Sequence, residues 1–458
     1  MILQKVSVAL LSWNGRRHLE TCLEALAEQD DPGVDWEILV LDNGSTDGTA
    51  DWLRAEILPR GARVRLIASP VNLGFCGGNN RLVAEAAGDA VAFLNNDTRP
   101  QRGWLKALVA ALAAAPPDVA AVSGKIIDWQ GTCLDFGRGV MTFDGHAFQL
   151  DFRRPLATAR VPAAGEELLF ACGGNMLIRR ASFLAAGGFD EDYFAYLEDV
   201  DLGWRLWSGG ERITFVPDAI VHHRSSATSD LLGLYNRGFL FERNAFLTAY
   251  KNYESGLWER IMPALLLTLV SRTQALLVEH NPGGATLLLD PYAGHIANTA
   301  PGKGKAPTPP ALPAAAASLP PAWTWAGFKV RWHGYGPMDF LRRGARKLVG
   351  APAVAAVPPS PPGSAPEPPR LTDERTIAQL RALSWLLGNL DHAAARREAV
   401  QKRRRRSDRE IFERFPLYVV PTYPGDHVLF AGSGFQAWLP EDLPLIRKTL
   451  DEIMSLSG

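Results

Sequence analysis

An apolar run that stops abruptly at polar residues sets the strongest constraint on how this chain folds. Residues 90–94 carry only apolar side chains, and Asn95, Asn96 and Asp97 follow them directly. A short run of this kind is typical of a strand buried in a parallel sheet. Ligands of open α/β sheets bind beyond the carboxyl ends of the strands, so Asp97 is placed to hold a metal ion. The alternative is that Asp97 only caps the helix expected from about Arg102.

The same alternation of apolar run and helical segment recurs through the first quarter of the chain. Further strands are predicted at residues 6–13, 36–41, 64–67 and 119–126. Such a β-α repeat predicts an α/β fold with a doubly wound, mostly parallel sheet. Residues 128–167 break the pattern with short aromatic pieces between glycines. We interpret them as irregular hairpins that line an acceptor pocket.

Polar loops follow the second and third predicted strands. Asp42 opens the loop DNGSTDGT, and Asn72 opens the loop NLGFCGGNN. Glycines before a helix let the backbone approach a ligand, and a helix N-terminus favours an anion such as a diphosphate. Glycine-rich turns of this kind are often only tight connections, so both interpretations stay open.

Two further groups of titratable residues lie in the second quarter of the chain. Glu198, Asp199 and Asp201 fall in the first turn of a predicted helix. Acidic side chains there offset the positive end of the helix dipole, the role we favour for Asp201. His222 and His223 end a later strand. An isolated histidine pair is more often structural than metal-binding, so it supports a metal site only if it faces Asp97.

Composition narrows the class of protein. With 48 basic and 49 acidic residues the net charge is −1, so no overall field draws the chain to nucleic acid. The four cysteines lack the spacing of a zinc or redox site, which fits a reducing cytosol. The apolar stretch 261–270 is interrupted at Arg272 and Gln274, short of the roughly 20 residues of a membrane span. We therefore expect no spanning helix, and no signal peptide before the first strand.

The C-terminal third has a different character. Residues 300–321 and 354–369 are rich in Pro and Ala, which predicts extended linkers. Residues 371–415 are predicted to be helical, with an apolar stripe that comprises Leu380, Leu383, Leu387 and Leu390. The basic run 402–406 follows. It is either a solvated helix face or a contact with an anionic membrane surface.

Taken in order, seven motifs resemble glycosyltransferase family 2, and most closely its rhamnosyltransferase-like members. The resemblance covers about residues 5–253. It implies a GT-A fold, the fold of nucleotide-diphospho-sugar transferases. The motifs are Ser12-Trp13-Asn14, Asp42-Asn43-Gly44-Ser45-Thr46-Asp47, Asn72-Leu73-Gly74-Phe75, Leu94-Asn95-Asn96-Asp97, Gly187-Gly188-Phe189-Asp190, Glu198-Asp199-Val200-Asp201-Leu202 and His223.

The resemblance also assigns roles in donor binding. Asp42 would recognise the nucleotide base, Trp13 would pack against that base, and Asn96 would lie near the ribose. Asn72 is counted with these donor-binding residues. Asp97, at the end of the strand, would contact the donor through a bound cation.

The remaining roles concern the metal and the chemistry. Asp97 and His223 would hold a divalent cation, Mg²⁺ or Mn²⁺, and Asp199 would be the catalytic base. His223 is chosen over His222 because its distance in sequence from Pro217 matches the family pattern. A shift of one residue in that match, which would make His222 the ligand, stays open. Many family members carry two acids where this chain has Asn96 and Asp97, so Asp97 alone can bind as a carboxylate.

These expectations combine into one functional hypothesis. An inverting, metal-dependent glycosyltransferase would move a sugar, rhamnose as the first guess, from a dTDP- or UDP-sugar to a hydroxyl of a cell-surface or lipid-linked glycan. It would be cytoplasmic, with contact to the inner face of the membrane. The alternatives are a non-catalytic nucleotide-sugar binding module and a nucleotidyltransferase of the same fold. The expected units are a catalytic domain (1–255), a helical extension (256–299), a linker (300–370) and a basic helical region (371–458).

Overall fold

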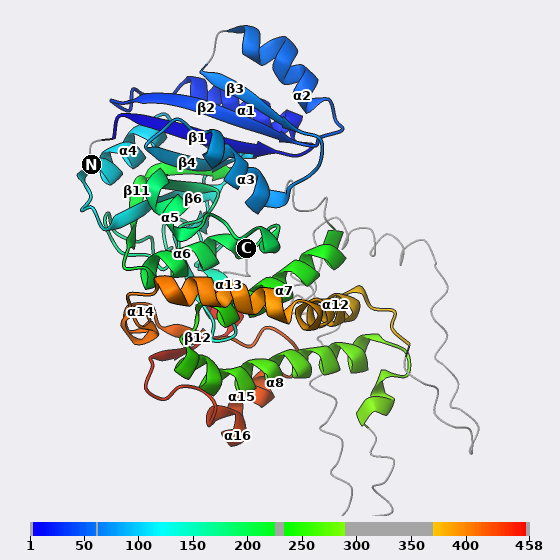
Figure 1. The fold of residues 1–458 in the computed structure, drawn as a ribbon. Helices are drawn as coiled ribbons and strands as arrows, with labels where there is room; N and C mark the ends of the chain where they lie inside the picture. Colours follow the sequence, from blue (N-terminus) through cyan, green and yellow to red (C-terminus); the bar gives the residue numbers. More distant parts are fainter. Residues whose placement is uncertain (1–2, 61–62, 225–232, 289–369, 455–458) are drawn as a thin grey trace, which may run out of the picture.

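The structure is a computed structural model that describes residues 3–60, 63–224, 233–288 and 370–454. Figure 1 shows an α/β part formed by the N-terminal half and, below it, a helical part in which α12 and α13 lie beside α7. The two expected Pro/Ala linkers lie outside the described residues, as does the segment 323–349 between them, for which the sequence predicts a short basic amphipathic piece with aromatic residues.

One large mixed sheet carries the α/β part. Its strand order is β3-β2-β1-β4-β10-β6-β11-β5, with β7 paired to β6. Parallel pairs join β1 to β2 and β4, β2 to β3, and β6 to β11, whereas β10, β5 and β7 run antiparallel to their neighbours. The doubly wound, mostly parallel α/β fold is therefore confirmed. The strands are β1 (Lys5–Ser12), β2 (Asp35–Asn43), β3 (Val64–Ser69), β4 (Ala90–Asn95), β5 (Thr98–Pro100), β6 (Val119–Asp128), β7 (Leu134–Phe136), β10 (Asn175–Arg179) and β11 (Arg212–His223).

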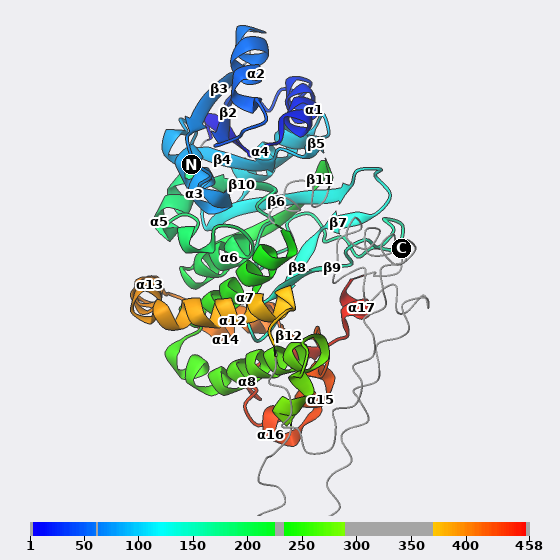
Figure 2. The same cartoon turned by 90° about the vertical axis from the view of Figure 1, so that its right-hand side faces the viewer.

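Helices cover both faces of this sheet (Figure 2). Helix α1 (Arg16–Ala27) buries one face, formed by Leu19, Cys22, Leu23 and Leu26, at the i, i+3, i+4, i+7 spacing of an amphipathic helix. After the loop that Asp42 opens, the apolar and polar pattern of residues 50–57 predicts a helix, and the structure has one α-helical turn followed by a π-helical turn and a 3-10 turn. The elements are α1 (Arg16–Ala27), α2 (Thr49–Trp52), η1 (Leu53–Ile57), η2 (Leu58–Arg60), α3 (Gly74–Glu85), α4 (Trp104–Ala114), α5 (Arg180–Ala186), η3 (Glu191–Tyr193) and α6 (Glu198–Ser208).

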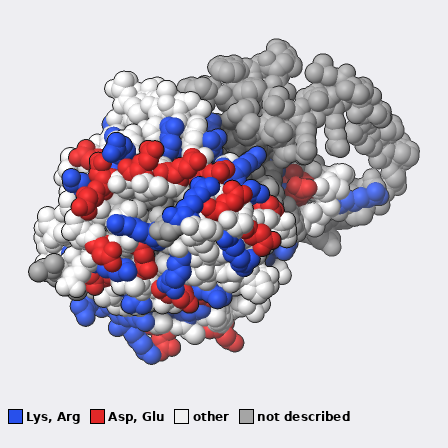
Figure 3. All heavy atoms as spheres, turned by 90° about the horizontal axis from the view of Figure 1, so that it is seen from above, with Lys and Arg blue, Asp and Glu red and all other residues white. Residues whose placement is uncertain are grey.

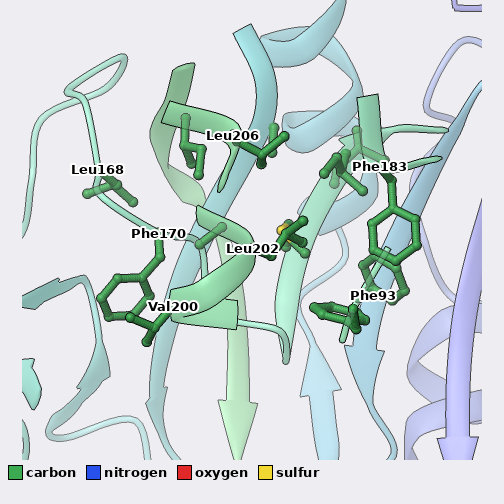
Figure 4. Packing of buried hydrophobic residues seen from close by; sticks show 14 of the residues in the cluster. Phe93, Leu168, Phe170, Phe183, Val200, Leu202 and Leu206 are labelled. Atoms are coloured by element: carbon green, nitrogen blue, oxygen red, sulfur yellow. The ribbon is translucent and has the colours of Figure 1, made fainter. Parts of the chain in front are cut away.

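Aromatic packing fixes α5 and α6 against the sheet. The ring of Phe93 on β4 lies 5.3 Å from that of Phe183 on α5 and 5.2 Å from that of Phe189. Figure 4 shows Leu202 and Leu206 of α6 projecting into the same core. Close packing of this kind leaves little freedom to the backbone at the start of α6. The residues at that helix start are therefore held firmly relative to the end of β4.

Residues 128–167 contain the hairpin that their sequence predicts. β8 (Arg138–Met141) pairs antiparallel with β9 (Ala147–Leu150). Both strands lie below the main sheet, between it and the helical part (Figure 2).

The helical part is built from the two segments 233–288 and 370–454. It continues the hydrophobic core of the α/β part, since Ile411, Phe412 and Leu417 belong to the same buried cluster as β1 and β4. Its elements are α7 (Gly233–Asn252), α8 (Ser255–His280), η5 (Gly284–Leu288), α12 (Glu374–Gly388), α13 (Leu390–Arg403), α14 (Asp408–Arg414), β12 (Leu417–Val419), α15 (Asp426–Ala431), α16 (Ser433–Gln436), β13 (Leu445–Arg447) and α17 (Leu450–Ile453).

The predicted apolar stripe of residues 371–415 is wrong for two of its four leucines, because Leu380 and Leu383 are half-buried but the other two are exposed. Leu387 is 71% exposed and Leu390 is 53% exposed. The buried face of α12 includes Thr376, Gln379, Ala382 and Leu386 instead. Small and polar side chains form this face because α12 packs closely on α7. The predicted stripe is therefore offset by one residue, about 100° around the helix, from the face that is buried.

Two arginines of the basic run make hydrogen bonds or ion pairs with other parts of the protein. Arg406 donates hydrogen bonds to the carbonyls of Gly210 and Glu211, both at 2.7 Å, just beyond the end of α6. Arg404 bonds Asp408 at 3.0 Å and the carbonyl of Asn252. Cations suit the carboxyl ends of helices, where carbonyl groups lack partners. For these two side chains a solvated helix face is the wrong interpretation.

Helix α8 is, among the described helices, long and apolar enough to cross a membrane by length and composition. However, 44% of its most apolar window is buried within the protein. Its Arg272 is 3% exposed and pairs with Asp144 at 2.8 Å and with Asp426 at 3.1 Å. A packed core helix passes the same composition test, so the expectation of no spanning helix stays a prediction.

Candidate active site

A cavity of about 670 Å³ opens at the carboxyl ends of β1, β2, β4 and β11. This is the edge of the sheet where strand-end polar residues were expected to meet. Six of the seven predicted site residues line the cavity, and these are Trp13, Asn72, Asn96, Asp97, Asp199 and His223.

Asp42 is the predicted residue that does not line the cavity. It ends β2 with 4% of its surface exposed, and its neighbour Asn43 lines the cavity in its place. Its Oδ1 atom is buried and has no hydrogen-bond partner within the described residues. A buried carboxylate oxygen without a donor is unfavourable by about 1–3 kcal/mol or more. Asp42 therefore has unused capacity to accept a hydrogen bond from a ligand.

Asn72 shapes the loop before α3. Its Oδ1 accepts hydrogen bonds from the Gly74 amide at 2.8 Å and from the side chain of Asn43 at 2.9 Å. The next amides, those of Phe75 and Cys76, donate to the carbonyl of Phe194 at 2.6 and 3.2 Å. The first amides of α3 thus already have partners. The turn serves as a tight connection, which was the alternative to a diphosphate site.

Gly74 makes this connection possible. Its φ is +73°, a left-handed conformation that glycine adopts without strain. A Cβ atom at this position would lie 2.6 Å from the carbonyl oxygen of Phe194. The glycine therefore allows the start of α3 to contact the segment that leads into α6.

Asp97 and His223 lie side by side at the rim of the sheet. The Oδ1 atom of Asp97 is 3.3 Å from Nε2 of His223, and Oδ2 of Asp135 on β7 is 2.9 Å from Nδ1. Burial lowers the pKa of His223, but the carboxylates of Asp135 and Asp97 outweigh it and raise that pKa to about 10. The imidazole is therefore held between two carboxylates.

His222 faces away from this group. Its Nδ1 atom lies 3.3 Å from the carbonyl oxygen of Trp129, and its Nε2 atom lies 3.2 Å from the side-chain nitrogen of Gln101. Successive residues of a strand point to opposite faces, so only one residue of the pair can face Asp97. The structure brings His223, not His222, to the cavity.

The capping interpretation of Asp97 is wrong. Strand β5 follows Asp97 directly, and α4 begins later, at Trp104. The N-cap of α4 is Gly103, with no side-chain capping bond. The carboxylate of Asp97 therefore does not cap α4, and it lies in the cavity wall.

Asp199 occupies the first turn of α6 and lines the cavity. Its Oδ2 accepts a hydrogen bond from the Gly173 amide at 3.1 Å, and its Oδ1 accepts one from the Val200 amide at 2.9 Å. Burial raises the pKa of Asp199 above its ordinary value, although both amides act against that shift. A carboxylate with a raised pKa, in a cleft, is suited to take a proton.

Asp201 has a different environment. It is fully buried, lies 2.8 Å from Arg205 and 3.0 Å from Lys251, and accepts a hydrogen bond from Asn252. Although burial raises its pKa, these two cations lower it to about 2. Asp201 thus joins α6 to α7 through ion pairs, beyond the dipole role expected for it.

Comparison with known proteins identifies the family. A family model described as Glycosyl transferase family 2 matches residues 7–185. The N-acetylglucosaminyl-diphospho-decaprenol L-rhamnosyltransferase of Mycobacterium tuberculosis is 34% identical over 242 residues, or 48% of this chain and 76% of that protein. The chain belongs to glycosyltransferase family 2. It is a glycosyltransferase of the rhamnosyltransferase-like branch, with the GT-A fold.

Two more distant similarities complete the comparison. Glycosyltransferase AglE of Haloferax volcanii is 28% identical to this transferase, over 50% of this chain and 69% of AglE. The crystal structure of S. aureus TarS 1-349 aligns with a TM-score of 0.42 and 17% identity, over 60% of this chain and 75% of TarS 1-349. The family match ends at residue 185, before Asp199 and His223.

Helix α7 holds the turn that leads to Asp199 in this family 2 glycosyltransferase. Phe194, Tyr196 and Leu197 have φ values of 61°, 72° and 63°, which are unusual for residues other than glycine. The side-chain amide of Asn244 lies within 2.8 Å of the carbonyl oxygens of both Ala195 and Tyr196. A strained backbone persists only where surrounding groups fix it. Asn244 is therefore a positioning residue for the start of α6.

Sequence reasoning missed Asn244 and Asp135. Neither residue belongs to a motif, and each contacts its partner from a distant part of the chain: Asp135 is 88 residues from His223 and Asn244 is 48 residues from Tyr196. The one available signal was the position of Asp135 in a short strand within the irregular region 128–167.

Proposed function

We propose that this enzyme is an inverting, metal-dependent glycosyltransferase that uses a dTDP- or UDP-sugar, with rhamnose as the first candidate sugar. The observation that carries the proposal is the joint placement of Asp97, His223 and Asp199 in the wall of one cavity. An electrophilic site for the donor and a base for the acceptor are thus available to one bound pair of substrates.

The donor set fits a divalent cation. Two ligands at about 2.1 Å in adjacent octahedral positions stand about 3 Å apart, close to the 3.3 Å between Oδ1 of Asp97 and Nε2 of His223. A histidine that binds a metal usually donates its other N–H to a carboxylate, the place that Asp135 takes here. Asp97 and His223 would hold Mg²⁺ or Mn²⁺.

The two protein ligands leave positions for the substrate. Within residues 3–60, 63–224, 233–288 and 370–454, no group of three or more His, Cys, Asp or Glu side chains could hold the ion. Cations bound by one or two protein ligands usually complete their shell with substrate phosphates and water. When bound, the ion stabilises negative charge on the departing nucleoside diphosphate.

The remaining site residues bind and orient the substrates. Trp13 would pack against the nucleotide base, and Asn96 would lie near the ribose, with Asn72 as a further donor-binding residue. Asp42 would recognise the base, which requires the loop after β2 to shift, because Asp42 lies outside the cavity lining and its Oδ1 is buried. Asn96 is itself held by a 3.1 Å hydrogen bond to Ser12. Because Asn96 is uncharged, Asp97 is the residue of this motif that would hold the metal as a carboxylate.

Asp199 performs the proton transfer. The acceptor hydroxyl loses its proton to the carboxylate as its oxygen attacks the anomeric carbon, while the bond to the nucleoside diphosphate breaks. General base catalysis of this kind contributes about 10²–10⁴ in rate. A single displacement from the face opposite the leaving group inverts the anomeric centre.

The acceptor is proposed from the printed activity of the relative. The M. tuberculosis enzyme acts on N-acetylglucosaminyl-diphospho-decaprenol, and we propose a polyprenyl-diphosphate-linked glycan here as well. A cytoplasmic enzyme would then contact the inner membrane surface, where such an acceptor lies. No nucleic-acid partner is proposed, and acidic and basic side chains are mixed over the described surface seen in Figure 3.

The test is the variant Asp199→Asn, which keeps the shape and removes the base. Turnover should fall by at least about 10²-fold, while the affinity for the nucleotide-sugar, measured by calorimetry, stays unchanged. Asp51→Asn, on an exposed turn of α2, is the control and should transfer sugar normally. Unchanged turnover in Asp199→Asn would contradict the assignment. Donor binding by a wild-type protein that transfers to no acceptor would favour a binding module.

A further inference from the structure

The lining of the cavity contains two chemically different parts. The residues at strand ends, including Asp97 and His223, are polar. A second part comes from the hairpin strand β9, helix α7, helix α17 and residues next to them: Phe148, Leu450 and Met454 pack around one buried cluster, and Tyr196 stacks on Phe241. We call this second part the apolar subsite, and it comprises Phe148, Phe152, Tyr196, Phe241, Leu450 and Met454.

Helix α17 is a fixed wall of this subsite. Ile453 of α17 is fully buried in a cluster with Val140 and Val420. Its carbonyl accepts a hydrogen bond from the Asp151 amide at 2.6 Å. Thr449 and Glu452 form a capping box at the start of α17. Figure 2 shows α17 near β9, against which it packs.

The lining favours an alkyl chain over a sugar. Each sugar hydroxyl that loses water needs a hydrogen-bond partner, whereas an alkyl chain needs only apolar contact. Gln149 and the hydroxyl of Tyr196 are the polar side-chain groups of this part of the cavity. The rings of Tyr196 and Phe241 stack with centroids 4.7 Å apart, which gives a flat apolar wall.

The apolar subsite adjoins the catalytic base. Tyr196 and Leu197 line the cavity immediately before Glu198 and Asp199 in the chain. An acceptor whose sugar hydroxyl meets Asp199 would place its sugar and diphosphate beside Tyr196, and its alkyl chain would follow farther along this wall, against Leu450 and Met454.

A positive charge stands beside the apolar subsite. The guanidinium group of Arg153 lies 5.4 Å from the ring centre of Phe152, and the residue is exposed. A diphosphate that joins a sugar to an alkyl chain would find its counter-charge there.

We propose that the apolar subsite binds the first isoprenyl units of a polyprenyl-diphosphate-linked acceptor, and that Leu450 and Met454 determine specificity for that chain. The inference rests on the proposed function and adds that the C-terminal segment completes the acceptor site. Recognition of the isoprenyl chain is thus separate from the chemistry, since neither Leu450 nor Met454 belongs to the polar part of the lining.

The experiment compares two acceptor analogues by calorimetry, which needs no turnover. One probe is N-acetylglucosamine linked through diphosphate to farnesyl, and the other carries methyl in place of farnesyl. The proteins are wild type, the double variant Leu450→Ala with Met454→Ala, and the control Val428→Ala. Val428 is apolar, 66% exposed and outside the cavity.

The double variant should bind the farnesyl probe about tenfold or more weakly than wild type, since two apolar side chains are truncated in a hydrophobic pocket. Binding of the methyl probe and of the donor nucleotide should not change, and Val428→Ala should match wild type throughout. Equal weakening of both probes would mean that α17 has only a structural role. Failure of wild type to prefer the farnesyl probe would also overturn the proposal. Failure of the proposed function would appear separately, as absent transfer despite intact probe binding.

Discussion

Replacement of Asp135 tests how His223 is oriented. The two side chains are joined by a contact of 2.9 Å between Oδ2 and Nδ1, and Asp135 is only 5% exposed. A hydrogen bond to a charged group contributes about 1.5–3 kcal/mol. Because every 1.4 kcal/mol corresponds to tenfold in affinity, Asp135→Ala should weaken Mn²⁺ binding about 10- to 150-fold. This range agrees with the effect of outer carboxylates on metal affinity in general, about 10–100-fold.

The assay is a Mn²⁺ titration followed by electron paramagnetic resonance, with UDP and dTDP in separate experiments. Asp135→Asn keeps an oxygen acceptor and loses the charge, so its effect should be smaller than that of Asp135→Ala. Asp51→Asn, whose carboxyl is 88% exposed, is the control. If Asp135→Ala binds Mn²⁺ within about twofold of wild type, Asp135 does not orient His223 for metal binding, and the proposed role of Asp135 is refuted.

Three other predictions follow from contacts outside the proposed metal site. Asn244→Ala removes the donors that hold the carbonyls of Ala195 and Tyr196, so kcat should fall by about 10²-fold with donor affinity unchanged; Asn244→Asp should fail likewise, and normal kcat in both would contradict the positioning role. Asp426→Ala removes one of the two carboxylates paired with Arg272 and leaves the amides of Thr422 and Tyr423 without their acceptor, so the free energy of unfolding, measured in urea, should fall by about 3 kcal/mol. Asp442→Ala, which breaks an exposed ion pair with Arg260, should lower it by only about 0–1 kcal/mol. Equal losses in the two variants would refute the argument that burial makes the Arg272 pair the more important one. Although burial lowers the pKa of His146, Asp144 and Glu242 raise it to about 9. The stabilisation by the protonated imidazole should therefore be complete below pH 6.5 and be lost as pH rises through 9. The difference in melting temperature between wild type and His146→Gln should shrink over that interval, and a constant difference would contradict a raised pKa of His146.

The sheet and the location of the site could be predicted because strand-end chemistry is local. The apolar run before Asn95 predicted β4, and its polar end predicted where Asp97 would lie. Strand alternation then decides between neighbouring histidines once β11 is placed. These are short-range properties that one segment of sequence contains.

The parts that could not be predicted depend on contacts between distant segments. Antiparallel β10 separates β4 from β6, and nothing in its own five residues specifies that place. Asn244 and Asp135 act on backbone or side chains that a single segment does not contain. The buried face of α12 was misjudged because Thr376 and Gln379 are buried on the helix, while Leu387 is exposed. The Gly-rich loop at Asn72 was open to two interpretations until Phe194 was seen to occupy the amides of α3.

The most direct test of the account is calorimetric binding of a panel of nucleoside diphosphates and nucleotide sugars, first with Mn²⁺ and then with a chelator. The account predicts that one nucleoside, uridine or thymidine, binds in the presence of Mn²⁺ and that binding weakens strongly when the metal is removed. His223→Ala should reproduce the effect of the chelator, whereas His222→Ala should not, because only His223 lies beside Asp97. Binding that is equally strong with and without metal, or no binding in either condition, would contradict a metal-dependent donor site in this cavity.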